Sequence, residues 1–146
     1  MTVIRKMTEG DRAEVAEMMR VFYASPAVST NGSDEIFKAD IDACIGDSPY
    51  LEGYVFAEGG TIKGYGMLAK SFSTEFGREC IWIEDIYLKP EHRGGGLGTE
   101  FLRFVEEKYG GCLLRLELEE ENERALRVYK SCGFDSLPYM EMKKLS

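Results

Sequence analysis

The sequence predicts a mixed α+β fold in which helices flank a central, mainly antiparallel sheet, with the element order β-α-α-β-β-β-α-β-α-β. Short runs rich in β-branched and aromatic residues alternate with helical patterns whose apolar residues recur on one face. Gly59 and Gly60 join two strand-like runs as a tight hairpin. Residues 81–88 form a further apolar run that leads through Pro90 and a glycine cluster into a helix. These features indicate helices packed on a sheet in one layered unit.

The first half of the chain begins with a short strand at residues 3–7. Thr8 and Asp11 then resemble a capping box, which predicts a helix to about Tyr23. Its apolar face consists of Val15, Met18, Met19 and Phe22. Residues 25–32 form a loop by composition, and Ser33 is placed to cap a second helix. The buried stripe of that helix consists of Phe37, Ile41, Cys44 and Ile45.

The second half opens with a hairpin of residues 50–58 and 61–71, in which Gly64 and Gly66 indicate a bulge or a close backbone contact. A buried strand follows at residues 81–88, and a helix then runs from Leu97 to about Tyr109. Further elements are a strand at 112–118, a helix that begins after Asn122, and a last strand at 139–145. Gly133 is placed to supply the left-handed position that ends the last helix.

Length and composition limit the function classes. The 146 residues predict one domain, 1–146, without an apolar run of the ~20 residues that a membrane span needs. The N-terminus lacks a signal-peptide pattern, so we expect a cytoplasmic protein. The net charge of −8 disfavours nucleic acid and favours a cationic partner, although acidic surfaces also serve solubility.

Metal and nucleophile chemistry find little support in the sequence. The four cysteines, Cys44, Cys80, Cys112 and Cys132, have no metal-ligand spacing and are expected to be buried free thiols. His92 is the only histidine, which argues against a zinc centre and against a histidine-based triad. We expect His92 to lie exposed beside the glycine cluster, and we expect no bound metal.

The glycine cluster between residues 93 and 99 has the chemistry of a phosphate site. Glycines let the backbone approach a ligand closely and adopt positive φ, and the first amides of the following helix lack intrahelical partners. With the helix dipole these amides bind anions. Thr99 stands where a dinucleotide-binding fingerprint needs glycine, and no Lys-Ser/Thr pair completes a P-loop. The alternative is a flexible turn without a ligand.

A second motif makes the pattern more specific. Arg93, Gly96 and Gly98 are followed by Asn122, Ala125, Tyr129, Gly133 and Phe134. On these residues the chain resembles the GNAT superfamily of acetyl-CoA-dependent N-acetyltransferases, clearly over residues 50–145 and by helical pattern alone before them. The triplet Ile83-Glu84-Asp85 is similar to the spermidine/spermine (diamine) acetyltransferase branch.

The resemblance implies acetyl-CoA as cosubstrate and a site for each of its parts. The backbone of Ile86, Tyr87 and Leu88 would bind the pantetheine arm in a gap between two splayed parallel strands. Arg93 and the amides of Gly94, Gly95, Gly96, Leu97, Gly98 and Thr99 would hold the pyrophosphate. Further cofactor contacts are expected at Asn122, Ala125 and Lys130.

Acetyl transfer to an amine needs a base, and Glu84 is the candidate because a carboxylate within an apolar strand is costly without a partner or a task. The alternative is a salt bridge, for instance to Arg115. Adjacent strand residues face opposite sides, so Asp85 shares the pocket only if a bulge turns one of the two carboxylates. Tyr129, two helical turns after Asn122, is the candidate acid toward the thiolate; the alternative is a packed aromatic side chain.

The segment between the first two helices would line the acceptor pocket in the resembled family. The substrate-binding candidates are therefore Tyr23, Ser25, Asn31, Glu84 and Asp85, with ordinary loop and cap chemistry as the alternative for the first three. We expect direct transfer to a primary amine, such as a polyamine or another small cationic amine. Other acceptors are an amino acid, an aminoglycoside or a protein amine; a non-catalytic acyl-CoA-binding regulator is the alternative from another class. The resemblance also implies a homodimer, in which the last strand could pair across the interface.

Overall fold

The computed structural model describes residues 1–28 and 31–146, and its centre is a five-stranded sheet with the order β1-β2-β3-β4-β5. The first four strands pair antiparallel and β5 pairs parallel to β4. The strands are β1 (Val3–Lys6), β2 (Leu51–Glu58), β3 (Thr61–Ser73), β4 (Arg78–Leu88) and β5 (Leu113–Leu116). The helices are α1 (Arg12–Tyr23), α2 (Asp34–Ile45), α3 (Leu97–Lys108) and α4 (Glu123–Ser131), and short 3-10 helices lie at Glu9–Asp11 and Pro90–His92.

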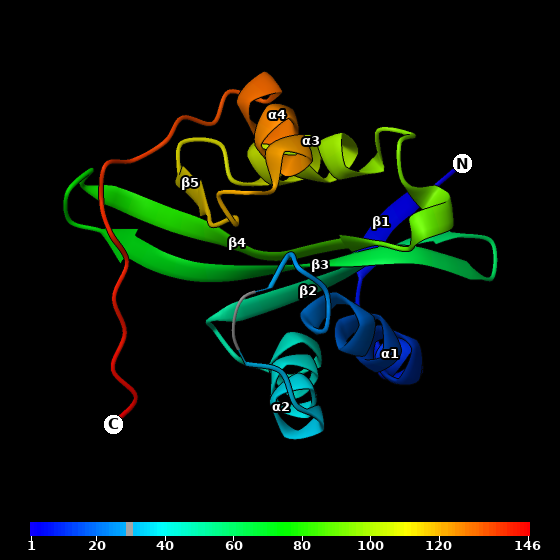
Figure 1. Ribbon diagram of the computed structural model, residues 1–146. Helices are drawn as coiled ribbons and strands as arrows, with labels where there is room; N and C mark the ends of the chain where they lie inside the picture. Colours follow the sequence, from blue (N-terminus) through cyan, green and yellow to red (C-terminus); the bar gives the residue numbers. More distant parts are fainter. Residues whose placement is uncertain (29–30) are drawn as a thin grey trace.

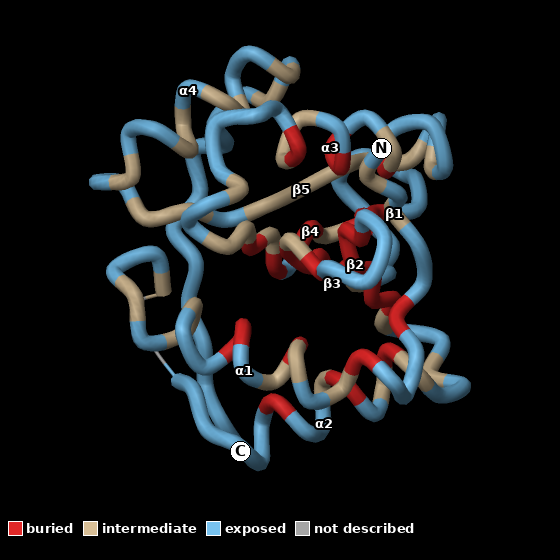
Figure 2. Tube along the Cα trace, turned by 90° about the vertical axis from the view of Figure 1, so that its right-hand side faces the viewer, coloured by how far each residue is buried: buried red, intermediate tan, exposed pale blue. Residues whose placement is uncertain are grey.

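The helices cover the sheet in two layers. Helices α1 and α2 lie on one face and α3 and α4 on the other, as Figure 1 shows. Buried residues gather on the strands and on the helix turns that face them (Figure 2). On the α1–α2 face the core includes Val15, Met19, Phe37 and Ile41, and on the α3–α4 face it includes Leu68, Phe101, Leu102 and Val105. The expected sandwich of helices on a mixed sheet is confirmed.

Local signals placed the first two helices correctly. The side chain of Asp11 accepts the backbone N–H of Thr8 at 2.8 Å, which is the reciprocal bond of the expected capping box. Ser33 Oγ accepts from the backbone N–H of Ile36 at 3.2 Å and so caps α2. Ser29 and Thr30 of the intervening loop lie outside the described residues.

Glycine in β3 permits a close approach, as the sequence predicts. A Cβ on Gly66 would lie 2.5 Å from the ring of Phe101, so this glycine lets α3 settle directly onto the sheet. The β2–β3 ladder also contains a bulge: Phe56 pairs with Gly64 and Ala57 with Ile62, which leaves Lys63 as the extra residue. Both interpretations of the β3 glycines therefore hold, one beside Gly64 and one at Gly66.

A second bulge lies in β4 and decides the direction of two side chains. Met67 pairs with Asp85 and Leu68 with Ile83, so Glu84 is the unpaired residue. Ile83 belongs to the core on the α3–α4 face, and Ile86 packs against that same core. Two residues instead of one separate them, so Asp85 faces α1 and α2 like its partner Met67, and the unpaired Glu84 interrupts the alternation. The bulge that the sequence analysis named as the exception to simple alternation is therefore present.

The parallel pairing of β4 with β5 is short. It joins Cys80–Ile83 to Leu113–Leu116, whereas β4 continues to Leu88. Among the described residues, the edge of β4 beyond Ile83 that faces β5 has no strand partner. The strand expected at 112–118 is thus shorter at both ends, and it stops where the gap for the pantetheine arm is expected.

The last predicted strand does not form. Residues 133–146 have no regular structure, and Met140, Met142 and Leu145 are exposed by 87%, 87% and 92%. An extended segment without a paired edge or a packed face has little to stabilise it as a strand. Figure 1 shows this C-terminal tail leaving α4 and passing the end of the β3–β4 hairpin toward the α2 side of the sheet, where Tyr139 Oη donates to Glu75.

Candidate active site

The loop between β4 and α3 presents backbone donors to an open space. Gly94 and Gly96 have φ of +86° and +84°, in the left-handed region that only glycine adopts without strain. The first backbone bond of α3 runs from Glu100 N–H to Gly96 C=O, so the amides of Leu97, Gly98 and Thr99 have no partner within the helix. A Cβ on Gly95, Gly96 or Gly98 would meet no atom within 4 Å. The loop therefore fits a diphosphate held by backbone N–H groups at a positive helix end.

Two arginines lie at this loop and differ in what they contact. Arg93 Nε donates to the carbonyl of Leu88 at 2.8 Å, and its guanidinium lies 5.4 Å from the ring centroid of Tyr87. The Nη2 atom of Arg124, in the first turn of α4, lies 3.8 Å from the position of a Cβ on Gly94. Within the described residues Arg124 forms no ion pair, so α4 brings a free positive charge to the loop.

The predicted cofactor residues of the second motif also lie on α4. Asn122 Oδ1 accepts from the backbone N–H of Ala125 at 3.2 Å and caps the helix, as expected, which leaves its amide NH2 free to donate. Lys130 is exposed in the last turn. Tyr129 packs into the α3–α4 core beside Phe134, with ring centroids 6.1 Å apart, and burial raises the pKa of its hydroxyl. That hydroxyl therefore stays protonated at neutral pH.

Glu84 is more exposed than the sequence suggests, because the bulge turns its side chain outward from the ladder. Within residues 1–28 and 31–146 it makes no ion pair and no side-chain hydrogen bond; Arg115, the partner of the alternative interpretation, lies over the ring of Trp82 at 4.8 Å. Surrounding protein nonetheless removes much of the water from the carboxylate. This desolvation, with the charges of Asp85, Glu141 and Asp40, raises the pKa of Glu84.

Asp85 is almost fully buried, with 5% of its surface exposed, and hydroxyl groups occupy both of its oxygens. Tyr23 Oη donates to Oδ1 at 2.9 Å and lies 3.1 Å from Oδ2, and Tyr65 Oη donates to Oδ2 at 2.7 Å. Burial raises the pKa of Asp85, and the two hydroxyl donors oppose that rise. The bulge thus gives its two carboxylates different surroundings.

Three further carboxylates converge on Glu84 from other elements. Asp40 of α2 has its pKa raised to about 6 by burial and by the charge of Asp85. Glu117, just after β5, has its pKa raised to about 7 by a hydrogen bond with Glu141, by burial and by the charges of Glu141 and Glu84. Glu141 lies on the C-terminal tail. The field around Glu84 is therefore strongly negative, as a site for a cation requires.

The predicted acceptor residues of the first loop are divided by the structure. Tyr23 joins Asp85 and lies at the site, with its ring 5.2 Å from that of Phe37. Ser25 Oγ donates to the carbonyl of Phe22 at 2.6 Å and closes the end of α1, which is the cap chemistry of the alternative interpretation. Asn31 is exposed, and within the described residues its side chain makes no hydrogen bond with Tyr23 or Ser25.

Sequence reasoning missed four residues near the site: Tyr65, Asp40, Glu141 and Arg124. Tyr65 lies within a predicted strand and Asp40 within a predicted helix, and no local motif distinguishes either residue. Glu141 was assigned to a strand that does not form. Arg124 stands two residues after Asn122 in the second motif. This place within a predicted cofactor-binding motif is the signal that could have identified it.

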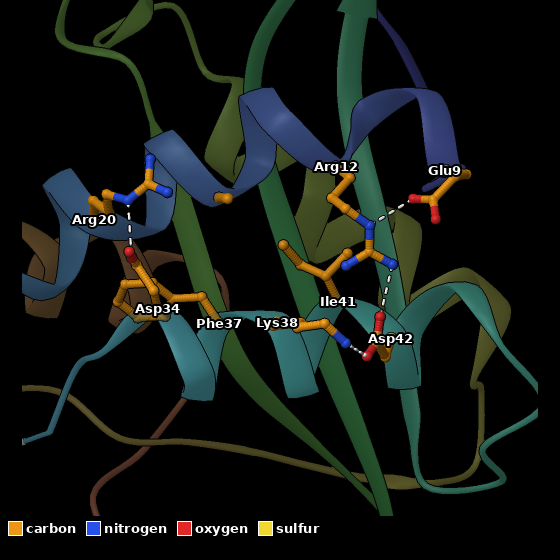
Figure 3. A pocket seen from close by; sticks show the side chains of 9 residues that line it. Glu9, Arg12, Arg20, Asp34, Phe37, Lys38, Ile41 and Asp42 are labelled. Atoms are coloured by element: carbon orange, nitrogen blue, oxygen red, sulfur yellow. Dashed lines mark hydrogen bonds and ion pairs between the residues drawn. The ribbon is translucent and has the colours of Figure 1, made fainter.

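A surface hollow of about 440 Å³ lies apart from these residues, between α1 and α2 (Figure 3). Its charged groups are paired with one another: Arg12 contacts Glu9 and Asp42 at 2.6 and 2.7 Å, and Arg20 contacts Asp34 at 2.9 Å. These ion pairs bridge the outer sides of the two helices, and exposed pairs of this kind contribute little each. A smaller hollow of about 290 Å³ lies beside the glycine loop and includes Lys63, His92 and Gly95.

Other findings concern metals, thiols and membranes. The described residues contain no group of three potential metal-binding side chains and no helix long and apolar enough to cross a bilayer. Cys44 and Cys80 are buried free thiols as expected, whereas Cys112 and Cys132 are only partly covered. His92, expected to be exposed, is partly covered as well.

Comparison with known proteins adds independent findings. The family model described as "Acetyltransferase (GNAT) family" matches residues 15–134. A thialysine N-epsilon-acetyltransferase from Bos taurus is 32% identical over 95% of this chain and 87% of its own length. An L-amino acid N-acyltransferase from Escherichia coli is 28% identical over 90% of this chain and 78% of its own.

Solved structures agree in fold. A possible acetyltransferase from Clostridium difficile matches with a TM-score of 0.81 at 17% identity, over 99% of this chain and 97% of that one. An aminoglycoside N-acetyltransferase in complex with coenzyme A matches with a TM-score of 0.79 at 15% identity, over 99% and 95%.

Proposed function

This chain belongs to the GNAT family of acetyltransferases, and we propose that it acetylates the primary amine of a small molecule that carries a second positive charge. Its activity is that of an N-acetyltransferase with acetyl-CoA as cosubstrate. The single observation that carries the proposal for the acceptor is the set of carboxylates around Glu84, which comes from β4, α2, the segment after β5 and the tail.

The glycine loop fits the diphosphate of acetyl-CoA, which supplies the activated acetyl group. We assign the amides of residues 94–99 to the diphosphate, as the resemblance implies, and add Arg124 as the nearby free cation. Arg93 supports the loop through the carbonyl of Leu88. The unpaired edge of β4 at residues 86–88 would bind the pantetheine arm, and Asn122 and Lys130 would approach it from α4.

In the proposed reaction Glu84 accepts a proton from the acceptor ammonium and so produces the neutral amine. A new bond forms between nitrogen and the acetyl carbon while the bond from that carbon to sulfur breaks. Tyr129 gives its proton to the departing thiolate, and the second proton that the nitrogen loses as it becomes an amide restores the Tyr129 hydroxyl. Tyr129 packs in the core on the α3–α4 face, and Glu84 lies at the β4 bulge next to Asp85, which bonds Tyr23 of α1. The gap beyond Ile83 is the place where groups from both faces can reach one acetyl group.

Two acceptor classes suit the charge of the site. A polyamine agrees with the Ile83-Glu84-Asp85 triplet. An amino acid with a side-chain amine agrees with the name of the relative from Bos taurus, and the relative from Escherichia coli is named for L-amino acids in general. Both acceptor classes carry a cation beyond the reacting nitrogen. A free amino acid also carries a carboxylate, which the acidic surroundings of Glu84 would repel. The electrostatics therefore favour a diamine or polyamine over lysine-like acceptors.

The decisive experiment measures thiol release from acetyl-CoA with matched amines: spermidine, putrescine, propylamine, thialysine and lysine. We expect kcat/KM for putrescine to exceed that for propylamine by at least tenfold. A preference for thialysine over both polyamines would assign the chain to side-chain acetylation of amino acids. Tight binding of acetyl-CoA without release for any amine would favour the non-catalytic regulator.

We further propose a cytoplasmic location, as the sequence predicts, and a homodimer, as the family resemblance implies. The exposed apolar side chains of the tail (Leu137, Tyr139, Met140, Met142 and Leu145) support a contact with a second copy. Light scattering on the full chain and on a chain that ends at residue 134 tests this. We expect the full chain to be dimeric and the shortened one monomeric; a monomeric full chain would refute the dimer.

A further inference from the structure

The strongest feature outside the assigned chemistry is the hydrogen-bonded group of Tyr23, Asp85 and Tyr65, which we call the tyrosine clamp. It joins three elements: the last residue of α1, the residue after the bulge in β4, and the centre of β3. All of its polar contacts are internal, since both oxygens of Asp85 accept from tyrosine hydroxyls. Asp85 therefore has little capacity left to bind an acceptor.

The clamp also explains why the bulge has one conformation. A bulge residue has no ladder partner, so the pairing alone does not fix its direction. Asp85 is held inward at 2.7 Å from a tyrosine that is itself fully buried and packed against Tyr87 and Phe22. Asp85 is fixed on one face of the sheet and Ile83 in the core on the other face. These two neighbours restrict the backbone conformation of Glu84.

We propose that Asp85 is a positioning residue: the tyrosine clamp anchors the β4 bulge and thereby holds Glu84 toward the acceptor, and Asp85 is not itself a ligand of the substrate. This deepens the proposed function and rests on it for the role of Glu84. In this proposal Tyr23 also has a positioning role, because its hydroxyl donates to Asp85 and not to the acceptor. The end of α1 and the catalytic strand then form one rigid wall of the acceptor site.

The charge of Asp85 has a separate, measurable effect. Groups that face Glu84 are Asp85 on its own strand, Asp40 on α2, Glu117 after β5 and Glu141 on the tail, while Arg115 of β5 is directed to Trp82. Tyr23 and Tyr65 stay neutral, because burial and Asp85 raise the pKa of each hydroxyl. Each of the carboxylates, when ionised, holds the pKa of Glu84 up.

Asp85→Asn separates positioning from ligand binding. The amide oxygen can take the place of Oδ2 and accept from both tyrosines, so the clamp keeps its geometry without its charge. Because a neutral amide oxygen accepts from the tyrosines more weakly than a carboxylate, we expect kcat to fall by about threefold with an unchanged KM for putrescine. The acid limb of the kcat/KM profile should move to lower pH, because the base form of Glu84 then persists to lower pH. A tenfold rise of KM for putrescine but not for propylamine would make Asp85 a ligand and overturn the proposal.

Tyr65→Phe together with Tyr23→Phe tests the clamp itself. Displacement of a catalytic group by about 1 Å can cost up to 10²-fold, so we expect kcat to fall by about 10–10²-fold with KM for acetyl-CoA unchanged. The matched control is Tyr54→Phe, because Tyr54 is equally buried and donates to Glu52 at 2.9 Å on the other face of the sheet. This control should lower the melting temperature but leave kcat within about twofold. Equal losses of kcat in both variants would refute a specific role of the clamp.

A readout without turnover keeps this result distinct from the proposed function. The carboxyl signal of Glu84 in the free protein can be titrated by NMR, with Glu84→Gln to assign it. We expect a lower pKa of Glu84 in Asp85→Asn than in wild type. An unchanged pKa would contradict the proposed proximity even if the enzyme is active, whereas a shifted pKa in a chain that acetylates no amine would leave the clamp intact and refute the acceptor assignment.

Discussion

Two buried carboxylates on opposite faces of the sheet both accept hydrogen bonds from tyrosine hydroxyls, but their pKa values are shifted in opposite directions. Glu52 of β2 accepts from the hydroxyls of Tyr54 and Tyr109, and Asp85 of β4 accepts from those of Tyr23 and Tyr65. Yet the pKa of Glu52 is lowered to about 2, whereas the pKa of Asp85 is raised. Burial opposes ionisation in both cases, so the difference must lie in the neighbours.

The neighbours differ in their cations. Lys70 lies 2.9 Å from Glu52, and Lys108 and Lys6 lie 3.7 and 3.9 Å away. Asp85 has no cation among its described contacts, and further carboxylates surround it. Glu52 therefore ties β1, β2, β3 and α3 together as a stable ion cluster. The region of Asp85 and Glu84 keeps its negative charge uncompensated, which suits a site that a cationic acceptor completes.

The largest effect should separate the two regions by activity. Glu84→Gln removes the proposed base without changing the size of the side chain, and we expect kcat to fall by ~10²–10⁴, the usual range for a general base. Glu52→Gln is the matched control and should leave kcat within about twofold. Initial-rate kinetics at pH 7 measure both. Wild-type activity of Glu84→Gln would remove Glu84 from this role.

The next effect concerns the acid on the α3–α4 face. Tyr129→Phe removes only the hydroxyl, so kcat should fall by ~10–10²-fold, at or below the low end of the range for acid–base catalysis, while affinity for acetyl-CoA stays close to wild type. Rates at saturating acetyl-CoA, with calorimetric binding of coenzyme A, distinguish the two quantities. Tyr109→Phe, which loses a hydroxyl beside Glu52 instead, is the control. An unchanged maximal rate would reduce Tyr129 to a packed aromatic side chain.

A smaller effect should appear at the cofactor loop. Gly96→Ala forces a Cβ into a left-handed conformation at a cost of about 1–2 kcal/mol and disturbs the amides that face the diphosphate. We expect KM for acetyl-CoA to rise severalfold. Gly77→Ala imposes similar strain at φ of +64° in a distant turn and should lower stability alone. Equal KM values in the two variants would argue against the loop as the diphosphate site.

The smallest effect belongs to Glu52 and is one of stability. Its folded pKa of about 2 lies below the ordinary value near 4.3, so the ionised side chain stabilises the fold above about pH 4.5, and that contribution is lost as the pH falls toward 2. Glu52→Gln should cost about 1–3 kcal/mol at pH 7. Urea unfolding at pH 7 and pH 3 measures the difference. If the loss of unfolding free energy in Glu52→Gln is as large at pH 3 as at pH 7, the negative charge of Glu52 is not the source of the stabilisation.

The features that the sequence could predict differ in one respect from those that it could not: their residues lie close together in the chain. The features that could be predicted in this way are the glycine loop, the caps at Ser33 and Asn122, and the hairpin at Gly59. These features were enough to predict the fold class and the family resemblance.

Features that depend on pairing between distant segments could not be predicted from the sequence. Alternation along 81–88 predicts opposite directions for Glu84 and Asp85, and only the register against Met67 and Leu68 reveals the bulge. Tyr65 lies twenty residues before its partner Asp85. The expected last strand has strand-like composition but pairs with no strand among the described residues, so composition alone gave the wrong state for 139–145.

A crystal structure with a bisubstrate analogue, coenzyme A joined through an acetyl linker on sulfur to putrescine, would test the central claim most directly. The account predicts diphosphate oxygens within hydrogen-bond distance of the amides of residues 94–99 and the acceptor nitrogen within reach of the Glu84 carboxylate. A diphosphate bound away from this loop, or an acceptor chain on the Glu52 face of the sheet, would contradict it.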